Sequence, residues 1–365
     1  MKENRSAALT RWLIAACAVL LALIFVVALL RRSASSAATT ATETAYTLDN
    51  SAGQVFAVTT GKEGQLVAAT NGGLQVFSPD GASVLHELMS FKQPGVTAGD
   101  NAAAAYDIGA ETLVVTDLEG DLNVVEPPGP VISARMNHKG WLALVTEAPG
   151  YRAVVTVYDD NHNAVYAWYS GSSYVLTAEL SEKGVLAVLC VDESGGSVRF
   201  FRLSEEDPVG VYAAEGTLFS DLCWADDGHA AAVSLSRVVF LNADGSAAGQ
   251  YDYNGLNLYD YDCAGSGFFT LCLSQYRSGS PTKLLTLSPR GEVLAELDAP
   301  EGLESVSVHG KQVLALCTRR LIQYNQQLEE MLTVELEQTG VRQALLLQSG
   351  RCVLVYDYAA QGLDF

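Results

Sequence analysis

One turn in this sequence has the spacing of a metal-binding loop. Asp159, Asn161 and Asn163 alternate with other residues as the first ligands of a calcium loop do. Such a loop has glycine at its sixth position and glutamate at its twelfth, whereas this chain has Ala164 and Ser170 there. We therefore interpret the segment as a solvated hairpin turn.

The five histidines also lack the spacing of a metal site. No His-x-His, His-x-x-x-His or His-Glu-x-x-His motif occurs, and neither does a Gly-x-Ser-x-Gly elbow or a phosphate-binding loop. Three histidines stand beside recurring glycines: His138, His229 and His309. The sequence predicts no catalytic residue, no cofactor and no metal ligand.

Six cysteines follow Cys17, and their even number in an exported chain would allow disulfides. They are Cys190, Cys223, Cys263, Cys272, Cys317 and Cys352. No Cys-x-x-Cys pair occurs, and most of them occupy matching places in successive repeats, which repeat geometry should hold apart. We expect buried free thiols that act as small apolar residues.

Aromatic residues form the candidate ligand-binding site. Tyr166, Trp168, Tyr169 and Tyr174 flank a Gly-Ser-Ser turn. A second group interleaves with aspartates and comprises Tyr251, Tyr253, Tyr259 and Tyr261. Aromatic rings beside small polar residues suit a flat ligand or a sugar. They suit packing between repeats equally, and packing is the interpretation that we favour.

These residues belong to a chain of short strands and turns. Between Gly140 and Val191, β-branched and aromatic runs are separated by turns rich in Gly, Pro, Asn, Asp and Ser. No apolar period of three to four residues is sustained beyond the N-terminus. Helices should therefore be scarce in the body of the protein.

A glycine recurs at or just before the start of an apolar strand. The eight positions are Gly64, Gly109, Gly140, Gly184, Gly228, Gly267, Gly310 and Gly350. Their spacing of about 41 residues is typical of four-stranded propeller blades, whereas β-solenoid repeats are usually shorter. The sequence predicts an all-β protein, a β-propeller of about eight four-stranded blades, with seven as the alternative.

Two places depart from the regular repeat. The short interval from Gly109 to Gly140 contains Pro127, Pro128 and Pro130, which cannot donate to a sheet ladder. We expect a missing or malformed outer strand there, as a blunted edge or a notch for a partner. The last repeat also lacks an outer strand, and residues 46–48 could supply it and close the ring.

The N-terminal segment is apolar. Residues 12–30 carry no charge and would span roughly 28 Å as a helix, enough to cross a bilayer. A cleaved signal peptide would be shorter, and a lipoprotein signal would end at Cys17. We predict a cytoplasmic N-terminus at 1–11, a transmembrane helix at 12–30, a Ser/Ala/Thr-rich linker at 31–45 and a propeller domain at 46–365.

Charge separates the anchor from the body. Residues 1–32 hold five of the 22 basic and one of the 42 acidic residues, so the remainder has a net charge of −24. Such a surface disfavours nucleic acid and anionic lipid. We expect a single-pass protein of the cell membrane with an extracytoplasmic C-terminal domain.

The anchor, linker and repeats, with the phrase GWLALVTEAPGYRAVVTVYDDNHNAVYAWYSGSSYVL at the centre, resemble an uncharacterised bacterial family of membrane-anchored propellers. More distantly, the blades are similar to quinoprotein-like and WD-type repeats, although the Trp-Asp dipeptide is absent. The resemblance implies a propeller at the cell envelope and brings no catalytic residues.

The favoured function is a membrane-tethered, extracytoplasmic scaffold that binds an envelope protein or a small ligand. The alternatives are a propeller enzyme of the quinoprotein or hydrolase type and a sensor coupled to other membrane proteins. An enzyme would need acids, bases or metal ligands that converge on the central channel.

Overall fold

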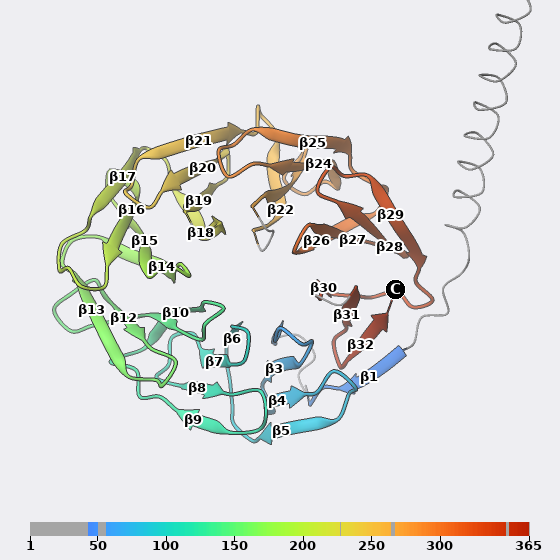
Figure 1. Ribbon diagram of the computed structural model, residues 1–365, viewed down its shortest axis with the longest axis horizontal. Helices are drawn as coiled ribbons and strands as arrows, with labels where there is room; N and C mark the ends of the chain where they lie inside the picture. The colour runs from blue at the N-terminus through green and yellow to red at the C-terminus, as the bar shows by residue number, and fades with distance from the viewer. Residues whose placement is uncertain (1–42, 50–55, 227, 264–266, 348–349, 365) are drawn as a thin grey trace, which may run out of the picture. The chain divides into compact units, whose positions relative to one another are not determined.

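Eight four-stranded antiparallel sheets form a ring, as the computed structural model shows (Figure 1). The structure describes residues 43–49, 56–226, 228–263, 267–347 and 350–364, and these contain strands and turns without a helix. The prediction of an eight-bladed, all-β propeller is confirmed. The predicted transmembrane helix at 12–30 lies outside the described residues, and no helix within them could cross a membrane.

Each blade is a four-stranded meander, numbered here in chain order. Blade 1 has β2 (Ala57–Thr60), β3 (Leu66–Thr70), β4 (Gly73–Phe77) and β5 (Ser83–Glu87). Blade 2 has β6 (Pro94–Ala98), β7 (Ala103–Asp107), β8 (Leu113–Thr116) and β9 (Leu122–Val124). Blade 3 has β10 (Val131–Met136), β11 (Leu142–Thr146), β12 (Ala153–Tyr158) and β13 (Ala164–Ser170). Blade 4 has β14 (Tyr174–Leu180), β15 (Val185–Asp192), β16 (Gly195–Arg202) and β17 (Gly210–Glu215).

The second half of the ring repeats this order. Blade 5 has β18 (Phe219–Asp226), β19 (His229–Ser234), β20 (Arg237–Asn242) and β21 (Ala247–Asp252). Blade 6 has β22 (Asn257–Asp262), β23 (Phe269–Ser274), β24 (Pro281–Leu287) and β25 (Val293–Asp298). Blade 7 has β26 (Leu303–His309), β27 (Gln312–Cys317), β28 (Arg320–Asn325) and β29 (Glu330–Glu335). Blade 8 has β30 (Gln343–Leu346), β31 (Arg351–Val355), β32 (Ala359–Asp364) and, from the other end of the chain, β1 (Glu43–Thr47).

The core lies between neighbouring blades. The middle strands β11 and β12 are buried along their whole length, whereas the outer strand β13 has exposed residues on one face. One apolar cluster joins Val145 and Val155 of blade 3 to Leu186 and Phe201 of blade 4. Burial on both faces explains why the middle strands are continuous apolar runs, because each blade is covered by the next on one side and by the previous on the other.

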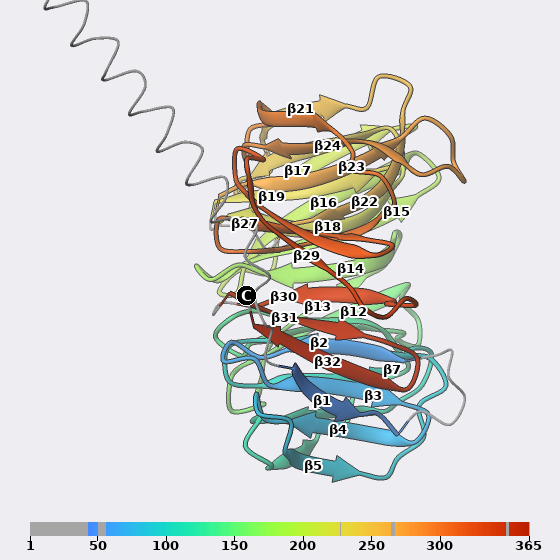
Figure 2. The ribbon, with the colours of Figure 1, turned by 90° about the vertical axis from the view of Figure 1, so that its right-hand side faces the viewer.

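The meander also fixes which loops share a face of the ring. Because successive strands are antiparallel, hairpins between the first and second and between the third and fourth strands of a blade lie on one face. The remaining hairpins and the connections between blades lie on the other. β1, as a fourth strand, begins on the first of these faces, which we name the entry face; the other is the opposite face (Figure 2).

β1 closes the ring, as predicted for residues 46–48. It pairs with β32, with Tyr46 opposite Ala360. The Tyr46 side chain is 1% exposed and its hydroxyl donates to the Pro79 carbonyl of blade 1 at 3.1 Å. The Arg351 guanidinium donates to Thr44 Oγ1 at 2.7 Å. β1 therefore joins blade 8 and contacts blade 1 at the same time.

One recurring glycine does not have the position that the sequence pattern predicted. Gly109 lies between the second and third strands of blade 2, whereas the turn between its first and second strands is at residues 99–102. Both kinds of hairpin can require glycine. Gly109, in the second hairpin of blade 2, has a φ of 82°, and Gly140, in the first hairpin of blade 3, has a φ of 83°. The interval from Gly109 to Gly140 is short because Gly109 marks a second hairpin, whereas Gly140 marks a first hairpin. The outer strand β9 is nevertheless only three residues long, in line with the expected malformed edge.

Candidate functional site in the central channel

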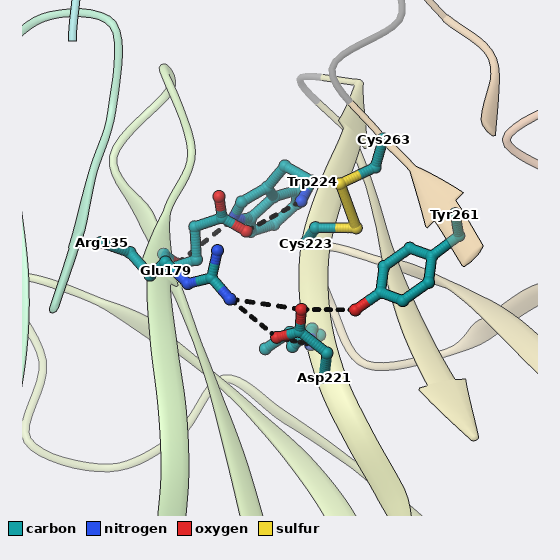
Figure 3. Close-up of a disulfide and its surroundings, with 8 residues drawn as sticks. Arg135, Glu179, Asp221, Cys223, Trp224, Tyr261 and Cys263 are labelled. Carbon is teal, nitrogen blue, oxygen red and sulfur yellow. Dashed lines mark hydrogen bonds and ion pairs between the residues drawn. A yellow bond between two sulfur atoms is a disulfide. The ribbon is translucent and has the colours of Figure 1, made fainter. Parts of the chain in front are cut away.

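Four polar side chains meet at the centre of the ring (Figure 3). Arg135, Glu179, Asp221 and Tyr261 come from β10, β14, β18 and β22, the first strands of blades 3 to 6. Arg135 Nη2 donates to both carboxylate oxygens of Asp221, at 3.0 and 3.2 Å. The Tyr261 hydroxyl donates to Asp221 Oδ2 at 2.6 Å. We name these four residues the polar layer.

Glu179 is held from the neighbouring blade. Its Oε2 accepts the backbone N–H of Trp224 at 3.0 Å, and its carbonyl accepts the indole N–H of Trp224 at 3.1 Å. The same kind of bond recurs in blades 6 and 7, where Asp262 Oδ2 accepts the N–H of Val308 at 2.7 Å. Carboxylates of the first strands therefore satisfy backbone donors of the next first strand, which have no ladder partner on the channel side.

Burial dominates the electrostatics of the polar layer. It raises the pKa of Glu179 to about 7, with a further rise from Asp221 and opposing contributions from Arg135 and the Trp224 N–H. Burial also raises the pKa of Tyr261, and the adjacent Asp221 carboxylate acts in the same direction. Burial lowers the pKa of Arg135, but the neighbouring carboxylates reverse this and raise it overall. Arg135 stays charged, and Glu179 is the group in this layer that titrates near neutral pH.

Blades 3 to 7 share an irregularity in strand pairing. Near its beginning, the first strand of each of these blades has a residue that the ladder to the second strand skips: Ile132, Leu176, Ser220, Tyr259 and Glu304. The first two strands of blades 1, 2 and 8 pair without a skip. β-Bulges re-aim side chains and are over-represented near functional sites. We name these five positions the bulge residues.

The polar layer lies between two cavities. The larger, of about 880 Å³, opens on the entry face and is lined by the ends of first strands and by the hairpins that follow them, including Glu182, Lys183, Asp226 and His229. The smaller, of about 370 Å³, is lined by Ile132, Leu176, Arg135, Asp221 and others from the beginnings and middles of those strands, and opens on the opposite face. The channel is therefore divided into two chambers of different chemistry.

The entry-face chamber holds two histidines that already have acidic partners. His138 Nδ1 lies 3.2 Å from Asp100 Oδ1, and Asp100 also pairs with Lys62 at 2.7 Å. His229 Nδ1 lies 2.9 Å from Asp226 Oδ1. The contacts of Asp100 connect the first hairpins of blades 1, 2 and 3, whereas the His229–Asp226 contact lies within the first hairpin of blade 5. Among the described residues no group of three or more His, Cys, Asp or Glu is placed to hold a metal ion.

The cysteine prediction is wrong for one pair. Cys223 on β18 and Cys263 directly after β22 form a disulfide between blades 5 and 6, with their Cα atoms 6.6 Å apart (Figure 3). First strands converge at the channel, so residues of neighbouring first strands that differ by one position in the repeat come within disulfide range there. The other four cysteines lie on second strands, farther from the axis, and are buried free thiols as predicted: Cys190, Cys272, Cys317 and Cys352.

The structure does not bring the four predicted aromatic residues into one site. Tyr166 and Trp168 point inward from β13 and pack on Phe201 of blade 4, with ring centroids 6.3 and 5.0 Å apart. Tyr169, on the other side of β13, contacts Tyr151. Tyr174 begins β14, half-exposed.

Tyr174 belongs to a separate cavity of about 580 Å³ on the opposite face. The Arg152 guanidinium lies 4.8 Å from its ring centroid and donates to its hydroxyl at 2.8 Å. Asp192, Glu193 and Ser194 line the other side of this cavity. Of the predicted group, Tyr174 therefore has the most open surroundings.

Sequence reasoning missed the polar layer. Tyr261 belongs to the second aromatic group, whereas Arg135, Glu179 and Asp221 are not part of any predicted site. A signal was present, because 135, 179 and 221 recur at about the repeat length and each precedes a first hairpin by a few residues. The segment with the spacing of a calcium loop is a hairpin turn, as predicted. Asp159 Oδ1 accepts the N–H groups of Asn161 and Asn163, at 3.0 and 2.8 Å, in the hairpin between β12 and β13.

The family of this chain is set by a sequence match over residues 38–357, nearly the whole propeller. The chain belongs to a family of unknown function, DUF5711. No curated protein matches it in sequence.

Several solved propeller structures resemble this DUF5711 protein at low sequence identity. BamB from Moraxella catarrhalis has a TM-score of 0.56 at 13% identity, covering 90% of this chain and 98% of that one. The C-terminal WD40 domain of Sif2 has a TM-score of 0.62 at 11% identity, covering 89% and 97%. AztD from Citrobacter koseri has 0.56 at 11% identity, covering 84% and 89%. At these identities the likeness concerns the fold alone.

Proposed function

We propose that this protein is a membrane-tethered, extracytoplasmic propeller that serves as a scaffold for a protein partner at the cell envelope. The observation that carries the proposal is the difference between the two faces of the ring. Large exposed apolar side chains occupy the hairpins and connections of the opposite face: Leu88, Ile108, Tyr151, Leu218, Leu235, Tyr276 and Tyr358. In the described hairpins of the entry face there are none.

Carboxylates occur on both faces. Glu63, Asp100, Glu119, Asp160 and Glu206 lie in entry-face hairpins, and Glu111, Glu193 and Glu301 lie on the opposite face. Leu235 and Tyr276 are 70% and 67% exposed on the opposite face, where nothing in the described chain covers them. Tyrosine and apolar residues are enriched in protein interfaces, whereas Asp, Glu and Lys are depleted. The two faces therefore differ in their exposed apolar side chains, which favour the opposite face as the binding surface.

Connectivity supports the tethered arrangement. The described chain begins at Glu43 on the entry face, and the charge-free segment 12–30 precedes it through a linker. The chain thus enters the ring at the entry face, and no chain end of the described propeller lies among the apolar side chains of the opposite face. A neighbour of similar fold belongs to the mitotic checkpoint complex, with a TM-score of 0.53 at 14% identity, covering 74% of this chain and 88% of that one. Propellers of this shape therefore occur in protein complexes.

The disulfide supports placement outside the cytoplasm. Disulfides persist in oxidising compartments and are rare in the cytosol. The Cys223–Cys263 bond links blades 5 and 6 at the channel wall and is therefore a structural disulfide.

The test combines topology with binding. A C-terminal reporter should be active only outside the cytoplasm, and activity only inside would overturn the placement. In-cell crosslinking should then yield a reproducible partner with the wild-type chain. Leu235→Glu together with Tyr276→Glu should lose that partner, while the entry-face control Glu119→Lys with Glu206→Lys should keep it. Loss in the control alone would show that the wrong face was chosen.

A further inference from the structure

The chamber on the opposite face has an apolar wall. Three bulge residues line it, Ile132, Leu176 and Ser220, together with Ile108 of blade 2. Leu176 and Ile108 are 38% and 43% exposed. Each bulge residue follows a residue that is buried or half-buried, such as Val175 before Leu176. Three of the residues that the pairing skips, Ile132, Leu176 and Ser220, thereby contribute to the wall of the chamber.

The floor of this chamber offers hydrogen bonds. Asp221 holds Arg135 through one guanidinium nitrogen, and the Arg135 side chain remains 41% exposed. The residues directly after the bulges include Ser133 and Thr177, whose buried hydroxyls have no hydrogen-bond partner among the described residues. Thr177 is 5% exposed and lines the chamber. Buried polar groups without partners are rare in proteins, so these call for an explanation.

Size and charge restrict what could enter. A volume of about 370 Å³ is near the lower limit of ligand pockets and admits a loop tip, not a domain. The charged residues that line the chamber are Asp221 and Arg135, and a second carboxylate, Asp260, directly precedes the lining residue Tyr261 on β22. An occupant with a basic residue is favoured there over an acidic one.

We propose that the partner inserts a loop into this chamber, with an apolar side chain against Leu176, Ile132 and Ile108 and a Lys or Arg beside it. Backbone carbonyls of the loop would accept hydrogen bonds from the free donors of Arg135. This inference rests on the proposed function, because the chamber opens in the middle of the apolar opposite face. It adds the chemistry of the partner and the point at which it enters the ring.

The experiment places a photo-crosslinking residue at Leu176, at Tyr276 and, as a control on the entry face, at Lys183 in the full-length chain in cells. We expect positions 176 and 276 to capture the same protein and position 183 to capture none. The peptide crosslinked at 176 should contain an apolar residue next to Lys or Arg. A synthetic copy of it should bind the purified wild-type chain, and Leu176→Glu should weaken binding at least tenfold, while Val211→Glu on the outer wall should not.

The outcomes separate the two proposals. Capture at 276 without capture at 176 would overturn the inserted loop and leave the scaffold intact. Capture only at 183 would overturn both. A peptide without a basic residue, or one whose affinity is the same for wild type and Leu176→Glu, would overturn the proposed chemistry. Retained folding of Leu176→Glu is checked by circular dichroism, and Leu176→Ala serves as a milder variant if it does not fold.

Discussion

Trp168 and Tyr169 are neighbours in the sequence with opposite environments. Trp168 packs on Phe201 across the blade interface, and the Arg199 guanidinium lies 5.5 Å from the Trp168 ring. Tyr169 is 51% exposed. Trp168→Ala should lower the free energy of unfolding by about 3 kcal/mol, and Tyr169→Ala by less than about 1 kcal/mol. Urea denaturation of both variants measures this. Equal losses would contradict the alternation along β13.

Glu179 should make stability depend on pH. Its pKa is raised to about 7 in the folded protein by burial, so the folded state binds this proton more tightly than the unfolded state does. The stabilising contribution of this proton should therefore be complete below the ordinary Glu pKa, fall as pH rises toward 7, and be lost above it. Asp260, whose pKa burial also raises, contributes in the same direction.

Glu179→Gln should remove most of this fall while keeping an acceptor for the Trp224 N–H. Urea denaturation at pH 5, 6, 7 and 8 gives the comparison. Glu205→Gln, an exposed surface change, is the matched control and should keep the wild-type slope. An unchanged slope in Glu179→Gln would show that this carboxyl is not the titrating group.

At the scale of the element, β1 is the strand on which closure depends. Tyr46 contacts Phe77 edge-on at 5.6 Å and bonds to Pro79, so its truncation disturbs blades 8 and 1 together. Tyr46→Ala should cost about 3–4 kcal/mol, whereas Thr47→Ala, on the exposed side of the same strand, should cost less than about 1 kcal/mol. Urea midpoints of the two variants provide the measurement, and a small effect of Tyr46→Ala would mean that the ring stays closed without this contact.

The repeating apolar runs of the sequence predict most of the strands, because the middle strands of a blade are buried on both faces. Middle strands such as β15 are apolar throughout and bounded by turn residues, so their number and order could be inferred. The assignment of hairpins within a blade is harder to predict, because glycines with positive φ occur in both kinds. Gly109 lies in a second hairpin and Gly140 in a first hairpin. The bulges could not be inferred, because skipping Leu176 depends on pairing with β15 and leaves no mark in composition. The polar layer depends on four strands converging, and local sequence does not encode that convergence.

For the whole molecule, the disulfide gives a chain-wide prediction. The denatured, unreduced protein should expose two thiols fewer than the same protein after reduction, and the linked peptides should contain Cys223 and Cys263. The four second-strand cysteines should react only after unfolding, because they are buried and burial raises the pKa of Cys190 to about 11. Thiol titration before and after reduction provides the count. No increase on reduction would show that the pair is not bonded in the isolated protein.

The pairing of β1 with β32 also determines how the ring would carry mechanical load. If the segment before Glu43 is fixed and a partner pulls on the ring, the force enters through five residue pairs, from Glu43–Leu363 to Thr47–Ala359. A pull along the strand must shear all five together, whereas a pull across it peels them one at a time from Glu43. The ring would then resist tension in one direction and open in another. A strand that closes the propeller would thus also set the force at which it comes apart.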